Sequence, residues 1–119
     1  MSEADSPREW RLYIDDMIVF AEKVIKFTGG IEQAGFVSDD MRFDATVRNL
    51  ELIGEAATRI PDMVRKSHPE IPRRLIVAVR NRLIHGYLGI DNDTLWSIIK
   101  TEVPALLPKL TPLASHNQS

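Results

Sequence analysis

Cysteine is absent from this chain of 119 residues, and its absence removes several kinds of protein from consideration. Without cysteine there is no disulfide framework, no zinc ribbon and no thiol nucleophile. Long hydrophobic runs are missing too, since the longest apolar stretches are the five-residue runs MIVFA and LIVAV. A membrane helix needs about 20 such residues, so we expect no transmembrane segment. The polar start MSEADSPREW lacks the apolar centre of a secretory signal, and a cytoplasmic protein is the simplest interpretation.

Acidic residues are absent from residues 71–90, although the chain as a whole carries a formal net charge of −2. The same stretch contains four arginines: Arg73, Arg74, Arg80 and Arg82. A local cluster of positive charge in an acidic chain is a candidate anion-binding site. A basic helix face that is merely solvated gives the same pattern, and charge alone favours that simpler interpretation.

Helical periodicity explains the first half of the chain. SPRE provides a capping box, and apolar residues then recur at three- and four-residue steps over residues 10–27 until TGG ends the helix. A second long helix is predicted from Asp39 to Ile60. Gly54 lies within it, and a residue without a side chain lets another backbone come close despite costing about 1 kcal/mol relative to alanine. The connector between these helices is predicted to hold one short helical turn, and so is the segment after Pro61.

The second half of the chain predicts two further helices. The third starts near Pro72 and runs toward Gly86, and its LIVAV segment is apolar on all sides. A helix of that kind is usually covered on several sides, so we expect it to be central. Asp91 caps a fourth helix over residues 92–103, which Pro104 kinks or ends.

The predicted elements define the fold class. Four helices with no strand and no internal repeat predict an all-α, antiparallel, up-and-down four-helix bundle with short extra helical turns. No composition shift marks a boundary, so residues 1–119 are predicted to form one domain. Residues 1–6 and 112–119 are predicted to be flexible tails.

The stretch RNRLIHGY, residues 80–87, is the most unusual part of the sequence. His85 is predicted at a helix end, where the helix dipole favours the imidazolium while the nearby arginines oppose it. A histidine in such surroundings suits general acid–base work near neutral pH. Asn81 lies four residues before His85 and shares its face. Arg80 aligns with Tyr87, seven residues on, if the helical path continues.

This set of side chains suits phosphate chemistry without a metal. Arginine binds phosphate through two parallel hydrogen bonds and stabilises charge that develops in a transition state, while histidine moves the proton. The three histidines, His68, His85 and His116, are far apart in sequence and show no metal-binding spacing. RNA is then the natural substrate, because its 2′-hydroxyl is an internal nucleophile. A histidine near a helix end is nevertheless more often a capping or packing residue than a catalytic one.

The motif and its surroundings resemble the HepT-like branch of the HEPN superfamily of helical ribonucleases. Arg80, His85 and Tyr87 match that family's R-x-x-x-x-H-x-Y motif. The segments RLYIDDMIVFAEKV, ATVRNLELIGEAA and AVRNRLIHGYLGID are similar to successive helices of the family, so the resemblance covers nearly the whole chain apart from the tails. One departure is Arg73 in IPRRL, where the family often has tryptophan.

The resemblance implies a function and a set of partners. Family members are toxins that cut RNA without a metal or cofactor, and they act as homodimers in which two motifs face one cleft. Arg80 would hold the scissile phosphate, and His85 would be the general base or acid. Tyr87 would be the residue to which a nucleotidyltransferase antitoxin attaches AMP. The remaining candidates, in supporting or RNA-binding roles, are Asn81, Arg82, Arg73 and Arg74.

Two other functions fit the same sequence. The chain could be a non-catalytic module that binds nucleotides, RNA or protein and partners a nucleotidyltransferase, in which case the arginines would matter and His85 would be dispensable. It could also be a structural partner that docks another chain through Trp10, Tyr13 and Trp96. Those aromatic residues fit the periodicity of core positions better.

Overall fold

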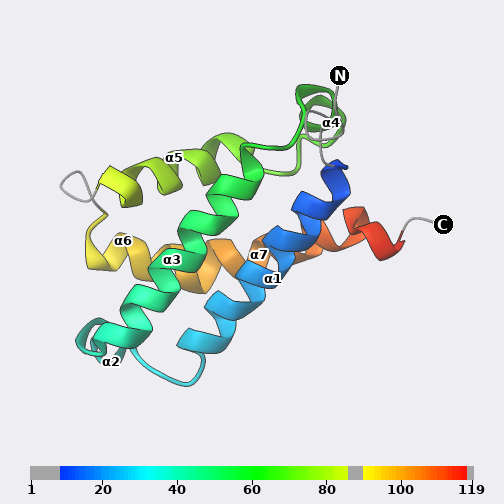
Figure 1. The fold of residues 1–119 in the computed structure, drawn as a ribbon. Coiled ribbons are helices and arrows are strands. Elements are labelled where there is room, and N and C mark those ends of the chain that lie inside the picture. The colour runs from blue at the N-terminus through cyan, green and yellow to red at the C-terminus, as the bar shows by residue number, and fades with distance from the viewer. Residues whose placement is uncertain (1–8, 86–89, 118–119) are drawn as a thin grey trace, which may run out of the picture.

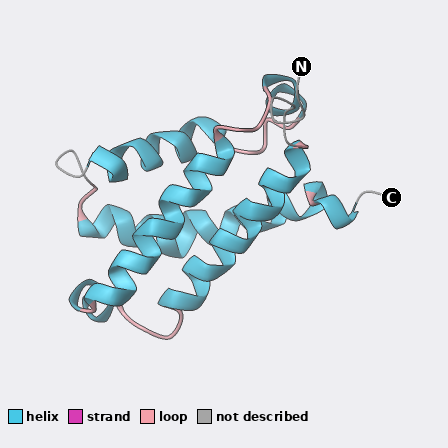
Figure 2. Cartoon of the chain, viewed as in Figure 1, coloured by secondary structure: helices cyan, strands magenta, loops and turns pink. Residues whose placement is uncertain are grey.

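The long helices run back and forth along the molecule in the computed structural model, which describes residues 9–85 and 90–117 (Figure 1). Helices α1 (Trp10–Thr28) and α3 (Asp40–Ala57) are antiparallel, and α5 (Arg73–His85) leads into the returning α6 (Asn92–Ser97) and α7 (Val103–Leu110). The shorter elements are α2 (Gln33–Ser38), α4 (Asp62–Ser67), a π-helical turn (Ile98–Glu102) and the 3₁₀ turns Thr111–Leu113 and Ser115–Asn117. Every element described is helical (Figure 2). The predicted all-α bundle with short extra turns is therefore confirmed.

Helix α3 begins where the sequence predicts and ends three residues earlier. The Asp39 carboxylate accepts a hydrogen bond from the backbone N–H of Arg42 at 3.1 Å, as an N-cap does. This backbone hydrogen bond, helped by one from the Arg42 side chain, lowers the pKa of Asp39. The helix ends at Ala57, so Ile60 lies beyond it, in a turn where its side chain is still buried.

The fourth predicted helix continues past Pro104. The π-helical turn Ile98–Glu102 precedes the proline, and the backbone N–H of Val103 bonds to the carbonyl of Ile98, five residues back. Pro104 then falls in the first turn of α7, a position at which proline is tolerated. The helical path therefore continues past Pro104 and reaches Leu110, so ALLPKL is helical.

The core lies between α1, α3 and the α6–α7 stretch. Helix α1 contributes a fully buried stripe that includes Ile14, Met17 and Val24. At one end of the core, Phe36 of α2 packs against Trp96, with ring centroids 5.3 Å apart. The other buried apolar side chains of α3 and the C-terminal stretch are Leu50, Ile53, Ala56, Ala57, Leu95, Ile99, Val103, Leu106 and Leu110.

Helix α5 is not central, contrary to the prediction from LIVAV. None of its residues is buried, and Leu75 is 50% exposed. It packs on α3 and lies at the edge of the molecule (Figure 1). The pattern shows that the helix is apolar on all sides, but only part of that surface is covered by this chain. None of the described helices is both long enough and apolar enough to cross a membrane.

The predicted flexible tail from residue 112 is wrong for its first residues. Leu113 and Ala114 are buried, at 8% and 0% exposed. The backbone N–H of Ser115 donates to the Asp15 carboxylate at 2.9 Å, and the Ser115 hydroxyl donates to its other oxygen at 2.5 Å. Two apolar residues and this paired contact hold the C-terminal turns against α1. The predicted N-terminal tail lies outside the described residues.

Candidate active site

The site is built where α5 crosses α3 with almost no space between them. A Cβ atom added at Gly54 would collide with Arg80 Cβ, and it would lie 2.6 Å from Arg80 Cγ and 3.3 Å from the carbonyl oxygen of Ile76. Only glycine allows this approach, because every other residue carries that atom. The prediction that Gly54 admits a neighbouring backbone is confirmed. The backbone it admits is the one that carries the arginine of the motif.

Two polar side chains hold the Arg80 guanidinium. Nη2 donates to Glu55 Oε2 at 2.5 Å, and Nη1 donates to Asn81 Oδ1 at 2.9 Å. The third nitrogen, Nε, is buried and has no hydrogen-bond partner. The Arg80 side chain is 26% exposed. Its stem is therefore embedded, while the end of the guanidinium is the part that a phosphate can approach.

Asn81 connects Arg80 with His85. Its side chain accepts from Arg80, and its backbone carbonyl oxygen lies 2.7 Å from His85 Nδ1. A carbonyl oxygen can only accept, so the contact favours the tautomer with hydrogen on Nδ1. In the neutral ring, Nε2 is then the nitrogen that accepts a proton. The His85 side chain is exposed. The arrangement thus places an exposed imidazole, with Nδ1 against a carbonyl oxygen, near a held guanidinium.

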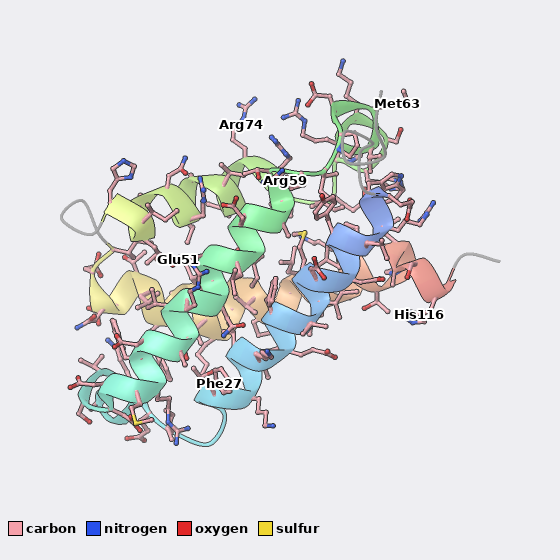
Figure 3. All side chains as sticks on the ribbon, viewed as in Figure 1. Phe27, Glu51, Arg59, Met63, Arg74 and His116 are labelled. Carbon is pink, nitrogen blue, oxygen red and sulfur yellow. The ribbon has the colours of Figure 1, made fainter. Side chains whose placement is uncertain are left out.

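The structure separates the other predicted site residues. Arg73 Nε donates to the carbonyl oxygen of Ala57 at 3.0 Å, and its Nη2 lies 3.5 Å from that of Thr58. This arginine caps the C-terminus of α3. Arg73 in IPRRL, the departure from the family pattern, therefore has a structural role. Arg74, in the first turn of α5, points away from the bundle (Figure 3). Tyr87 lies outside the described residues.

An apolar groove lies on the other side of α5, between that helix and the α6–α7 stretch. It has a volume of about 510 Å³ and includes Leu75, Ile76 and Val79 of α5. Charges of both signs line it as well, among them Arg82 and Glu102. Arg82, predicted in a supporting or RNA-binding role, lines this groove.

Within the described residues, no group of three or more histidine, aspartate or glutamate side chains could hold a metal ion.

Glu55 belongs to this site, although sequence reasoning gave it no role. It lies 25 residues before Arg80, on a different helix. Its second carboxylate oxygen is 3.9 Å from the guanidinium of Arg59. The available signal was indirect. Because Gly54 lets α5 approach α3 closely, the next residue on α3, Glu55, lies close to the side chains of α5, and here it meets Arg80.

Comparison with known proteins places the sequence among ribonuclease relatives. The family described as "Ribonuclease HepT-like" matches residues 17–113. The Thermococcus cleftensis protein named "Probable ribonuclease HepT" is 37% identical over 106 residues, which are 89% of this chain and 96% of that protein. "Putative RNase MJ1380" of Methanocaldococcus jannaschii is 39% identical over 101 residues, 85% of this chain and 93% of the relative. No solved structure matches the chain significantly.

Ribonuclease-like helical proteins are thus the class that the fold and the motif define. The family match spans most of the chain, and both relatives align over nearly their whole length. The chain belongs to the HepT-like ribonuclease family.

Proposed function

We propose that this protein is a metal-independent endoribonuclease that acts as the toxin of a toxin–antitoxin pair. The observation that carries the proposal is the connection of Arg80 and His85 through Asn81, at the exposed end of α5. Cleavage of RNA by its own 2′-hydroxyl uses a guanidinium that stabilises the developing charge and a histidine that moves a proton. Membership of a ribonuclease family supports the same activity.

In the proposed reaction, His85 Nε2 takes the proton from a 2′-hydroxyl and the freed oxygen attacks the adjacent phosphorus. The bond from phosphorus to the 5′-oxygen breaks. A general acid, separate from this His85, protonates that 5′-oxygen. The products are a 2′,3′-cyclic phosphate and a 5′-hydroxyl. Arg80 neutralises the charge that grows on the non-bridging oxygens. Each step uses a proton or an electron pair already present, so no metal is required.

A homodimer is part of the proposal because the reaction needs both a base and an acid. One chain supplies one His85, and a second copy would supply the other. The uncovered surface of α5 supports such an assembly, because Leu75 and Ile84 are half exposed and the apolar groove runs along the same helix. Exposed apolar surface of this kind usually marks an interaction site. Its mixed rim charges suit a self-complementary contact.

Regulation by a nucleotidyltransferase antitoxin rests on the resemblance at Tyr87, two residues after His85. By that resemblance, AMP attached there would bring a phosphate and a bulky base into the cleft that binds RNA. The added negative charge would compete with RNA for the Arg80 guanidinium. An unmodified Tyr87 is therefore a condition for testing the activity.

The test is RNA cleavage in EDTA by protein whose intact mass shows no modification. His85→Ala is compared with His116→Ala, which removes a histidine at the far end of the molecule (Figure 3). We expect wild type and His116→Ala to cleave equally and His85→Ala to be inactive. Cleavage by His85→Ala at the wild-type rate would refute the catalytic role. Salt-sensitive RNA binding without cleavage by wild type would instead support the non-catalytic module.

A further inference from the structure

The environment of Arg80 restricts how its guanidinium can meet a phosphate. An arginine can present either the edge formed by Nε and one Nη, or the end formed by both Nη atoms. Here Nε is buried without a hydrogen-bond partner, and the Cβ and Cγ atoms of the same side chain pack on α3 at Gly54. The side edge is therefore closed to any ligand. A phosphate can reach only the Nη1–Nη2 end of Arg80.

Glu55 lies on one of those two nitrogens. Its Oε2 accepts from Arg80 Nη2 at 2.5 Å, while Asn81 accepts from Nη1 at 2.9 Å. Each Nη carries two hydrogens, so each retains one after donating to its protein partner. Glu55 and Asn81 together fix the plane of the guanidinium. Without Glu55, nothing on α3 that the structure describes accepts from Arg80 Nη2.

We propose that Glu55 is a positioning residue that orients Arg80 for the transition state of RNA cleavage, an inference that rests on the proposed function. Its carboxylate holds the guanidinium with the Nη1–Nη2 end toward the substrate. Binding groups placed before the reaction stabilise developing charge without reorganising, and small misplacements are costly. The same carboxylate is an anion beside a polyanionic substrate, so it opposes the binding of RNA.

These two effects give Glu55 a signature that a purely structural ion pair lacks. Glu55→Gln keeps the shape and one acceptor but removes the charge. A positioning residue of this kind predicts slower cleavage together with tighter RNA binding. An ion pair that only joins α3 to α5 predicts a lower melting temperature, with rate and affinity unchanged for the folded fraction.

The experiment compares Glu55→Gln and Glu55→Ala with the matched control Glu51→Gln. Glu51 lies one turn earlier on α3 (Figure 3), and it pairs with Arg48 at 3.4 Å rather than with Arg80. Single-turnover cleavage in EDTA gives the rate at saturating RNA. Titration with a 2′-O-methyl version of the same RNA, which cannot react, gives the affinity.

We expect both Glu55 variants to lower the saturating rate by about tenfold to a hundredfold and to tighten RNA binding by about twofold at low salt. Glu55→Gln should lose less rate than Glu55→Ala, since it retains an acceptor for Nη2. Glu51→Gln should cleave at the wild-type rate. Folded Glu55→Ala that cleaves as fast as wild type would overturn the inference while leaving the ribonuclease intact.

A second measurement tests Glu55 without using activity. In NMR spectra of ¹⁵N-arginine-labelled protein, the buried Arg80 Nε–H should exchange slowly with water in wild type and faster in Glu55→Ala. Arg80→Lys assigns the resonance. Unchanged exchange in Glu55→Ala would refute the positioning role. If exchange is faster in Glu55→Ala but the wild-type protein does not cleave RNA, Glu55 still orients Arg80 and the proposed function is refuted.

Discussion

Asn81 contacts His85 through its backbone and Arg80 through its side chain. The carbonyl oxygen of Asn81 lies 2.7 Å from His85 Nδ1, and Oδ1 of the same residue accepts from Arg80 at 2.9 Å. The spacing of four residues on a helix produces the first contact, and adjacency in sequence produces the second. The tautomer of His85 therefore depends on the helix, whereas the orientation of Arg80 depends on which side chain follows it.

This division predicts unequal effects of substitution at the two positions. Asn81→Ala keeps the backbone carbonyl and hence the His85 contact, but it removes one acceptor from Arg80. We expect it to lower the saturating cleavage rate by about threefold to tenfold, which is less than the roughly hundredfold cost of a 1 Å misplacement, because Glu55 still holds the guanidinium. His85→Ala should abolish cleavage. Single-turnover rates at saturating RNA measure both, and equal losses would show that the Asn81 side chain has a role in the chemistry itself.

Arg73 and Arg74 are adjacent but should respond in opposite ways. Arg73 donates to the carbonyl oxygen of Ala57 at the end of α3, so Arg73→Ala should lower the free energy of unfolding by about 1–2 kcal/mol. Arg74 is exposed and points into solvent (Figure 3). Arg74→Ala should leave stability unchanged but weaken RNA binding and reduce the salt slope by about 1. Urea unfolding and RNA titration at several salt concentrations separate the two. A loss of stability in Arg74→Ala would contradict this assignment.

Gly54 should tolerate no larger side chain. Gly54→Ala places a methyl group against the Arg80 stem and the backbone of α5. Overpacking of this kind costs about 1–3 kcal/mol, and moving α5 away would also displace Arg80. We expect lower stability in urea unfolding together with slower RNA cleavage.

Gly35 provides the matched control for that substitution. It lies within α2, and a Cβ added there meets no atom within 4 Å. Gly35→Ala should stabilise the protein slightly, since alanine favours a helix over glycine by about 0.5–1 kcal/mol. The same chemical change should thus have opposite signs at the two positions. A neutral Gly54→Ala would mean that α5 can shift freely on α3.

Local chemistry explains what the sequence could predict about this molecule. The Asp39 cap, the glycine contact at Gly54 and the position of His85 at the end of a helix each follow from a few neighbouring residues. Glu55 could not be found in this way, because its partner is 25 residues away on another helix. The capping role of Arg73 was missed for the same reason. Contacts between helices depend on crossing geometry, which periodicity does not contain.

The misplacement of α5 has a different origin. Apolar residues on every side of LIVAV indicate that the helix avoids water, but they do not say which chain covers it. This chain covers the side that meets α3 and leaves Leu75 and Ile84 half exposed. The central position predicted for α5 is wrong within one chain. In the proposed homodimer, a second copy of the chain would bury the exposed apolar side of α5.

The last prediction concerns that uncovered surface. Leu75→Asp places a charge on α5 beside the apolar groove, at a side chain that is 50% exposed in this chain. Folding should tolerate the change, since the residue is not in the core. Association of two chains should not tolerate the change, because burying an unpaired charge in an interface costs free energy. We expect wild type to be a dimer and Leu75→Asp a monomer by light scattering at micromolar concentration.

Val19→Asp is the control, because Val19 is 47% exposed on α1. It adds the same charge at nearly the same exposure but away from the groove, so this variant should remain dimeric. If each cleavage event uses one His85 as base and another as acid, monomeric Leu75→Asp should also lose RNA cleavage while Val19→Asp keeps it. A wild-type monomer would refute the dimer. A monomeric Leu75→Asp with full activity would show that one chain supplies both proton transfers.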